Sequence, residues 1–264
     1  MMRGGLAAVL VAVLAGGVLS GCGRAAPPTS SPGSASGAAA LPRSIVALGD
    51  SVPRGTNCDC TPYPPLTAGD LGTTIGSEVS ATNDSVAGYT TDGVLRQLDK
   101  DESVIKHVGG ADVVEIEVGA NDVAHTGSCG TDLSCYTDEI PQVEKNLTTI
   151  VARVHELTGG AHVVVVLLDY WSVWLGGSYA AAEGEAYVAT AQELTDEINA
   201  AIKSVATASG SVYVDLRAAF KGPDYAYDET HYLSDDGDHP NAAGHRQIAD
   251  ATAAAVATTL HLTR

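Results

Sequence analysis

The chain has 264 residues, and its 32 Asp and Glu against 14 Lys and Arg give a formal net charge of −18 at pH 7. This charge disfavours nucleic acid as a partner, because contacts to phosphates need Lys and Arg. The same charge repels anionic lipid head groups, so we expect any membrane attachment to come from a lipid anchor and not from a basic patch.

The first 21 residues are predicted to be a lipoprotein signal peptide. Their apolar run, residues 6–19, is shorter than the roughly 20 residues that a membrane span needs. The run ends in LSGC, residues 19–22, which resembles a bacterial lipobox, in which cleavage leaves Cys22 as the lipid-bearing N-terminus. The alternative is an ordinary signal peptide cut near Ala25. We therefore expect an exported protein, either on the outer face of the cell membrane as a lipoprotein or secreted.

The next segment, residues 22–42, is predicted to be a disordered tether that begins with the lipidated Cys22. Its Pro, Gly, Ser and Ala residues cannot bury enough apolar surface to offset the entropy of the chain. The remaining segment, residues 43–264, has a length that one α/β domain commonly fills. Three segments are thus expected: a signal peptide, a tether and one folded domain.

Five short apolar runs within that domain are predicted to be strands buried on both faces of a parallel sheet. They cover residues 44–48, 78–81, 112–118, 161–168 and 211–215. Between the runs, segments such as 140–157 and 187–208 carry apolar residues three or four positions apart, which is typical of amphipathic helices. Alternating strands and helices predict an α/β fold, a three-layer α/β/α sandwich with a roughly five-stranded, flavodoxin-like parallel sheet.

Four cysteines lie in the predicted domain, namely Cys58, Cys60, Cys129 and Cys135. An even count in an exported chain suggests two disulfides, and four cysteines allow three pairings. We favour Cys129 with Cys135, which leaves Cys58 with Cys60, while the crossed pairings stay open. A zinc site needs ligands at C-x-x-C or similar spacing, which is absent, so we expect no metal.

The stretch VALGDSVPRG, residues 46–55, runs from the first predicted strand directly into a Gly-Asp-Ser corner. Ligands of such sheets bind outside the carboxyl ends of the strands, and Ser51 lies at that end. Three further polar segments fall at comparable positions, residues 83–88, 119–122 and 235–241. All of them can reach the rim of the sheet where Ser51 lies. Polar groups could therefore surround the Ser51 hydroxyl, which makes Ser51 a candidate nucleophile.

A serine nucleophile needs a base to take its proton and a third group to orient that base. His239 precedes Pro240, a good first helical residue, so its side chain can project from the mouth of a helix. Asp236, three positions upstream, is close enough to hold one ring nitrogen. The alternatives for this acidic loop are a plain helix cap and a calcium loop, whose spacing pattern is not met.

The order of these segments resembles the SGNH hydrolase family, also called GDSL esterases and lipases. The four residues that name the family match Ser51, Gly88, Asn121 and His239, and the resemblance extends from about Ser44 to Ala255. It implies Ser51 as nucleophile, Asp236 and His239 as its partners, and an oxyanion hole formed by the Ser51 N–H, the Gly88 N–H and the Asn121 amide. A glycine N–H and a neutral amide also suit an oxyanion on chemical grounds.

Some positions near the motifs are left open by the sequence. Val52 stands where the family pattern has leucine, an apolar change that should leave the turn intact. Arg54 either meets an acidic substrate group or faces water, and we favour water. Trp171 and Trp174 follow the fourth predicted strand, where they either line a substrate pocket or cap the edge of the core.

We therefore expect a carboxylic-ester hydrolase that works through an acyl-enzyme without a cofactor. Its partner would be a small-molecule, lipid or carbohydrate ester. Alternative activities on the same fold are those of a polysaccharide O-acetyl esterase, a thioesterase or a phospholipase. An inactive surface binding protein is the alternative from another class, and the presence of all four motif residues argues against it. The acyl length, the alcohol and the oligomeric state are not predicted.

Overall fold

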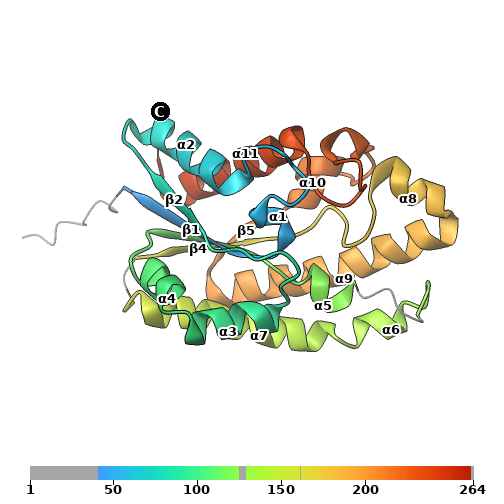
Figure 1. Cartoon of the computed structure of the whole chain (residues 1–264), viewed down its shortest axis with the longest axis horizontal. Helices are drawn as coiled ribbons and strands as arrows, with labels where there is room; N and C mark the ends of the chain where they lie inside the picture. The colour runs from blue at the N-terminus through green and yellow to red at the C-terminus, as the bar shows by residue number, and fades with distance from the viewer. Residues whose placement is uncertain (1–40, 125–128, 161, 263–264) are drawn as a thin grey trace, which may run out of the picture. The chain divides into compact units, whose positions relative to one another are not determined.

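The computed structural model describes residues 41–124, 129–160 and 162–262. The predicted signal peptide, Cys22 and the tether up to residue 40 lie outside these ranges. Within them, one parallel sheet has the strand order β2-β1-β3-β4-β5 (Figure 1). Its strands are β1 (Ser44–Gly49), β2 (Ser80–Asn83), β3 (Val113–Glu117), β4 (Val164–Leu168) and β5 (Val212–Val214). The predicted fold class is confirmed.

Helices cover both faces of the sheet (Figure 1). One face carries α2 (Tyr63–Ile75), α10 (Leu216–Lys221) and α11 (Ala242–Thr259). The other carries α3 (Thr91–Lys100), α4 (Glu102–Gly109), α7 (Ile140–Leu157) and α9 (Glu185–Ser209). Shorter elements lie in the connections, namely α1 (Ser51–Arg54), α5 (Ala120–Val123), α6 (Ser134–Thr137), α8 (Gly177–Glu183) and the 3₁₀ turn η1 (Thr230–Tyr232).

The core has two parts because successive strand residues point to opposite faces of the sheet. Leu48 packs with Leu147 of α7 and Leu194 of α9 in one cluster. Ile45 packs with Ile248 of α11 in the other. Full burial of such side chains stabilises the fold by about 1.5–3 kcal/mol each. No helix in the described ranges is long and apolar enough to span a membrane.

The second strand lies two residues later than the sequence predicts, at Ser80–Asn83 and not at 78–81. Ser80 pairs with Ser44, and Asn83 pairs with Ala47. β2 is an edge strand whose side chains are exposed or partly exposed. Its sequence therefore lacks the apolar run that marks a buried strand. Its bounds are set by the hydrogen bonds to β1.

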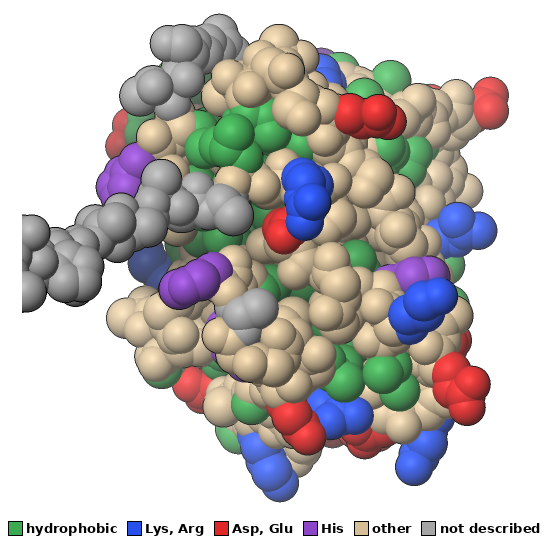
Figure 2. Space-filling view, turned by 90° about the vertical axis from the view of Figure 1, so that its left-hand side faces the viewer, with side chains coloured by type: hydrophobic (Ala, Val, Ile, Leu, Met, Phe, Trp, Pro, Cys, Tyr) green, Lys and Arg blue, Asp and Glu red, His purple; other side chains and the backbone are tan. Residues whose placement is uncertain are grey.

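The end of the molecule that Figure 2 shows is opposite the carboxyl ends of the strands. Lys and Arg side chains are scattered over this surface, with Asp and Glu side chains between them. A phosphate backbone is bound by clustered basic side chains, and this face does not gather them.

Central strand β3 buries a carboxyl group. Glu115 is 0% exposed, and its carboxyl oxygens have no hydrogen-bond partner in the described part of the chain. Burial disfavours the charged form and raises the pKa of Glu115 to about 8. Glu115 is therefore held protonated at neutral pH.

This raised pKa predicts that stability falls as the pH rises. The unfolded chain loses the Glu115 proton near its ordinary pKa of about 4.5, whereas the folded chain keeps it up to about pH 8. The stabilisation is therefore complete below about pH 4.5 and is lost progressively between there and pH 8. Glu115→Gln should remove this loss and stabilise the protein by on the order of 5 kcal/mol at pH 9, with little effect at pH 5.

The measurement is thermal unfolding of Glu115→Gln and of the wild type at both pH values. Glu102→Gln, which changes an exposed side chain at the start of α4, is the control and should change neither melting temperature by much. A change in Glu115→Gln that is equal at pH 5 and pH 9 would contradict the raised pKa.

Candidate active site

Ser51 is positioned by a sharp corner at the end of β1. Gly49 has φ 146°, and a Cβ there would lie 2.0 Å from the Glu117 carbonyl oxygen, so glycine is required. The Asp50 backbone N–H donates to that carbonyl at 3.1 Å. The Asp50 carboxylate then accepts from the Val52 N–H at 3.0 Å and caps helix α1. Ser51 is thereby the first residue of a helix at the carboxyl end of a strand.

Asp50 is a buried support for this corner. It is 1% exposed, and the Tyr170 hydroxyl donates to its Oδ2 at 2.7 Å. Burial, the largest effect, raises the pKa of Asp50 to about 6, although the Val52 N–H and the Tyr170 hydroxyl act to lower it. Two donors from different elements therefore fix the residue that precedes Ser51.

His239 and Asp236 form a hydrogen-bonded pair, as predicted. His239 Nδ1 lies 2.7 Å from Asp236 Oδ2, whereas the nearest Asp238 oxygen is 3.8 Å away. Asp236 Oδ1 also accepts from the backbone N–H groups of Asp238 and His239, at 3.1 and 3.0 Å. Asp236, and not Asp238, is thus the residue whose carboxylate is hydrogen-bonded to the His239 ring.

Asn57 also contacts this pair, and no motif in the sequence predicts that contact. Asn57 Nδ2 donates to Asp236 Oδ2 at 2.6 Å, and the Ser234 hydroxyl donates to the Asn57 carbonyl at 3.1 Å. Burial acts to raise the pKa of Asp236, but the hydrogen bonds from Asn57, His239 and the backbone lower it to about 2. Asp236 is therefore ionised at neutral pH, and the loop after α1 is fastened to the loop that carries it.

Ser51, Asn121 and His239 line one cavity of about 50 Å³. No hydrogen bond joins Ser51 to His239 among the described residues, and such bonds commonly tighten only when a substrate binds. The Asp236 contact at Nδ1 leaves Nε2 of His239 as the nitrogen that can accept a proton. The rest of the wall includes Ala120, Tyr170, Trp171, Ser172 and Val173.

Asn121 and Gly88 differ in how closely they approach this cavity. Asn121 lies on α5 directly after β3, and its Nδ2 donates to the Tyr89 carbonyl at 3.0 Å, which leaves the second amide hydrogen for another acceptor. Gly88 has φ 79° in the turn after β2 and is exposed. The Val86 N–H ties this turn to the Gly49 carbonyl at 3.0 Å. Gly88 is outside the lining of the cavity.

The three side chains that the sequence left open take different positions. Trp171 lines the cavity and stacks on Phe220, with ring centroids 4.3 Å apart. Trp174 is buried in the core, edge-on to Tyr136 at 5.0 Å. Arg54 is exposed. Of the three, the cavity wall includes Trp171.

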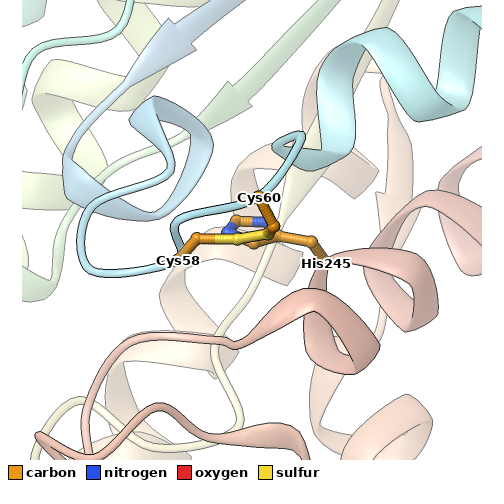
Figure 3. A group of neighbouring side chains, drawn as sticks. All are labelled: Cys58, Cys60 and His245. Atoms are coloured by element: carbon orange, nitrogen blue, oxygen red, sulfur yellow. A yellow bond between two sulfur atoms is a disulfide. The ribbon is translucent and has the colours of Figure 1, made fainter.

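The cysteines lie in two neighbouring pairs. The Cα atoms are 5.0 Å apart in Cys58 and Cys60 and 5.9 Å apart in Cys129 and Cys135, distances that suit a disulfide. Figure 3 shows the first pair beside His245 of α11. Both disulfides stay predictions.

Among the described residues, Cys58, Cys60 and His245 form a group that could hold a metal ion, since their ligand atoms lie within 4.8 Å of one another. His245 is fully buried, and burial lowers its pKa to about 4, so its ring is neutral. Cysteine binds metals as a thiolate, and a disulfide between Cys58 and Cys60 removes both thiolates. The absence of a metal site stays an expectation.

Comparisons with solved structures find proteins of the same fold. Among solved structures, the lipase Lip_vut3 from a goat rumen metagenome is 22% identical, with a TM-score of 0.64, and the match covers 80% of this chain and 96% of that one. An acetylxylan esterase from Geobacillus stearothermophilus is 21% identical, with a TM-score of 0.58, over 81% of this chain and 94% of that one. At these identities the likeness shows the fold.

No curated protein matches the chain. The sequence pattern of the GDSL-like lipase/acylhydrolase family matches residues 47–247, which include the Ser51 corner, Asn121 and the His239 loop. The chain therefore belongs to this family, the SGNH hydrolases, and is a hydrolase that acts on ester bonds.

Proposed function

We propose that this chain hydrolyses carboxylic esters through an acyl-enzyme on Ser51. The observation that carries the proposal is the Asp236–His239 hydrogen bond beside a cavity that His239 shares with Ser51 and Asn121. The Nδ1–H group of His239 donates a hydrogen bond to the Asp236 carboxylate, which holds the ring in the tautomer whose Nε2 is a base. The order of the motifs along the chain adds support.

In the first half of the reaction, His239 takes the Ser51 hydroxyl proton while Oγ forms a bond to the ester carbonyl carbon. The carbonyl oxygen becomes an oxyanion, for which the Ser51 N–H, the Gly88 N–H and the Asn121 amide are the proposed donors. The ester C–O bond then breaks, and His239 gives its proton to the leaving alcohol. Water attacks the acyl carbon by the same route, which releases the acid and restores Ser51.

Asn121→Ala tests the oxyanion hole. Removal of one such donor typically lowers kcat by about 10² to 10³-fold, and we expect that loss for p-nitrophenyl acetate with little change in KM. The reason is that the amide contacts the oxyanion more strongly than the ground-state carbonyl. An Asn121→Ala variant with wild-type kcat would exclude Asn121 from the oxyanion hole.

Asn57→Ala tests the support of Asp236. A hydrogen bond to a charged group contributes about 1.5–3 kcal/mol, so we expect kcat/KM to fall about tenfold. Asp59→Ala is a matched control, because Asp59 is exposed and also has a positive φ, 47° against 58° for Asn57. Equal losses in the two variants would mean that backbone strain, and not the contact to Asp236, is responsible.

A further inference from the structure

A second cavity, of about 400 Å³, adjoins the cavity of Ser51. It lies between α8, the start of α9, α10 and residues 226–229. Trp171 and Ser172 line both cavities, so the two cavities are neighbours at this segment. A substrate held at Ser51 is therefore close to the second cavity.

The two cavities differ in the size of the group that they accommodate. A water molecule needs about 10–15 Å³ of such space. By that measure the 50 Å³ around Ser51 corresponds to about four non-hydrogen atoms, the size of an acetyl group. The 400 Å³ cavity has the size of ordinary ligand pockets, which span about 300–1,000 Å³.

The polar side chains of the larger cavity include two cations, and each of them is paired with a carboxylate. Arg217, 7% exposed, pairs through Nη1 with Asp196, and its buried Nε has no partner in the described part of the chain. Lys221 Nζ lies 2.6 Å from Glu229 Oε2. Because each cation has a carboxylate partner, the wall offers hydrogen-bonding groups without an excess of positive charge. A neutral ligand with oxygen acceptors suits this wall better than an anion.

The rest of the lining argues for a ligand that is polar and also has apolar faces. Leu175 is partly exposed and supplies apolar surface, whereas Trp171 and Ala191 line the cavity but are buried. Tyr227 stands on the rim and is 64% exposed, with its ring close to Gly222. A long acyl chain would cover the Arg217–Asp196 and Lys221–Glu229 ion pairs without offering them a hydrogen bond, which is unfavourable.

We propose that this cavity binds the alcohol part of the substrate, a neutral polyhydroxylated group of one or two sugar rings. The C–H faces of the rings would contact Leu175 and Tyr227, and their hydroxyls would meet Arg217, Lys221 and Glu229. The cavity of Ser51 would take an acyl group of acetyl size. The inference rests on the proposed function of Ser51 and adds the class of its substrate.

A pair of neighbouring alanines on α8 gives a matched test. Both side chains are exposed, but Ala181 lines the cavity and Ala182 is outside its lining. The probes are p-nitrophenyl acetate, p-nitrophenyl octanoate and mono-O-acetyl cellobiose, used with the full chain. Ala181→Trp should lower kcat/KM for the acetylated disaccharide about tenfold or more, relative to its effect on p-nitrophenyl acetate. Ala182→Trp should leave this ratio unchanged.

Tyr227 gives an independent readout. Tyr227→Ala should raise KM for mono-O-acetyl cellobiose about threefold to tenfold, and Tyr227→Phe, which keeps the ring, should restore it. Because the side chain is exposed, neither change should disturb folding.

Three results would overturn the inference. If Ala181→Trp affects p-nitrophenyl octanoate more than the acetylated disaccharide, the cavity binds the acyl chain. If it affects all probes equally, the cavity does not bind the alcohol part. If the wild type hydrolyses none of them, including p-nitrophenyl acetate, the proposed function fails first and the inference fails with it.

Discussion

Ser51→Ala is expected to lower kcat/KM for p-nitrophenyl acetate by about 10⁴-fold or more, because it removes the oxygen that forms the acyl-enzyme. The corner that holds Ser51 depends on other atoms, namely Gly49, the Asp50 carboxylate and the Tyr170 hydroxyl. Alanine is also a good helix former at the first position of α1. The melting temperature should therefore stay within about 2 °C of the wild type.

The measurement is steady-state kinetics together with thermal unfolding of both proteins. If the variant loses activity but keeps its melting temperature, Ser51 takes part in the reaction itself and not in folding. Wild-type turnover by the alanine variant would exclude Ser51 as the nucleophile and would contradict the mechanism as a whole.

Asp236→Asn is the second change with a large expected effect, a fall in kcat of about 10³ to 10⁴-fold. The asparagine amide can donate to His239 Nδ1, which favours the tautomer with the proton on Nε2. That tautomer cannot take the Ser51 proton. The variant also loses the negative charge that stabilises the protonated ring once the proton has moved.

Asp238→Asn is the matched control for this change. Its carboxylate lies in the same loop, but 3.8 Å from His239 Nδ1, against 2.7 Å for Asp236. We expect the control to lose less than about tenfold in kcat, as for a charge that is not hydrogen-bonded to the ring. A larger loss in Asp238→Asn than in Asp236→Asn would show that the wrong carboxylate has been assigned.

The buried strands and amphipathic helices could be predicted from the sequence because their side chains follow the period of the element. The predicted helix 140–157 coincides with α7, Ile140–Leu157. Strand β2 lies two residues later than predicted because an edge strand with exposed side chains carries no such pattern. The rule that ligands bind at the carboxyl ends of parallel strands also placed Ser51, Asn121 and His239 on one rim, and all three line one cavity.

Contacts between distant segments could not be predicted from the sequence. Asn57 and Asp236 are 179 positions apart, and no periodicity or motif links them. Glu115 lies within a run predicted from its apolar neighbours, and its raised pKa arises only because the helices cover both faces of β3. Trp171 and Trp174 have the same chemistry, so packing alone decides which of them reaches the cavity.

The most direct test of the central claim, that His239 activates Ser51, is to label the full chain with a fluorophosphonate and locate the adduct by peptide mass spectrometry. Serine attack on phosphorus expels fluoride and leaves a stable phosphonyl ester, so it uses the same oxygen and base as ester hydrolysis. We predict one adduct, on Ser51, and its near absence in His239→Ala. An adduct on a different residue, or ester turnover by protein that is not labelled, would contradict the account.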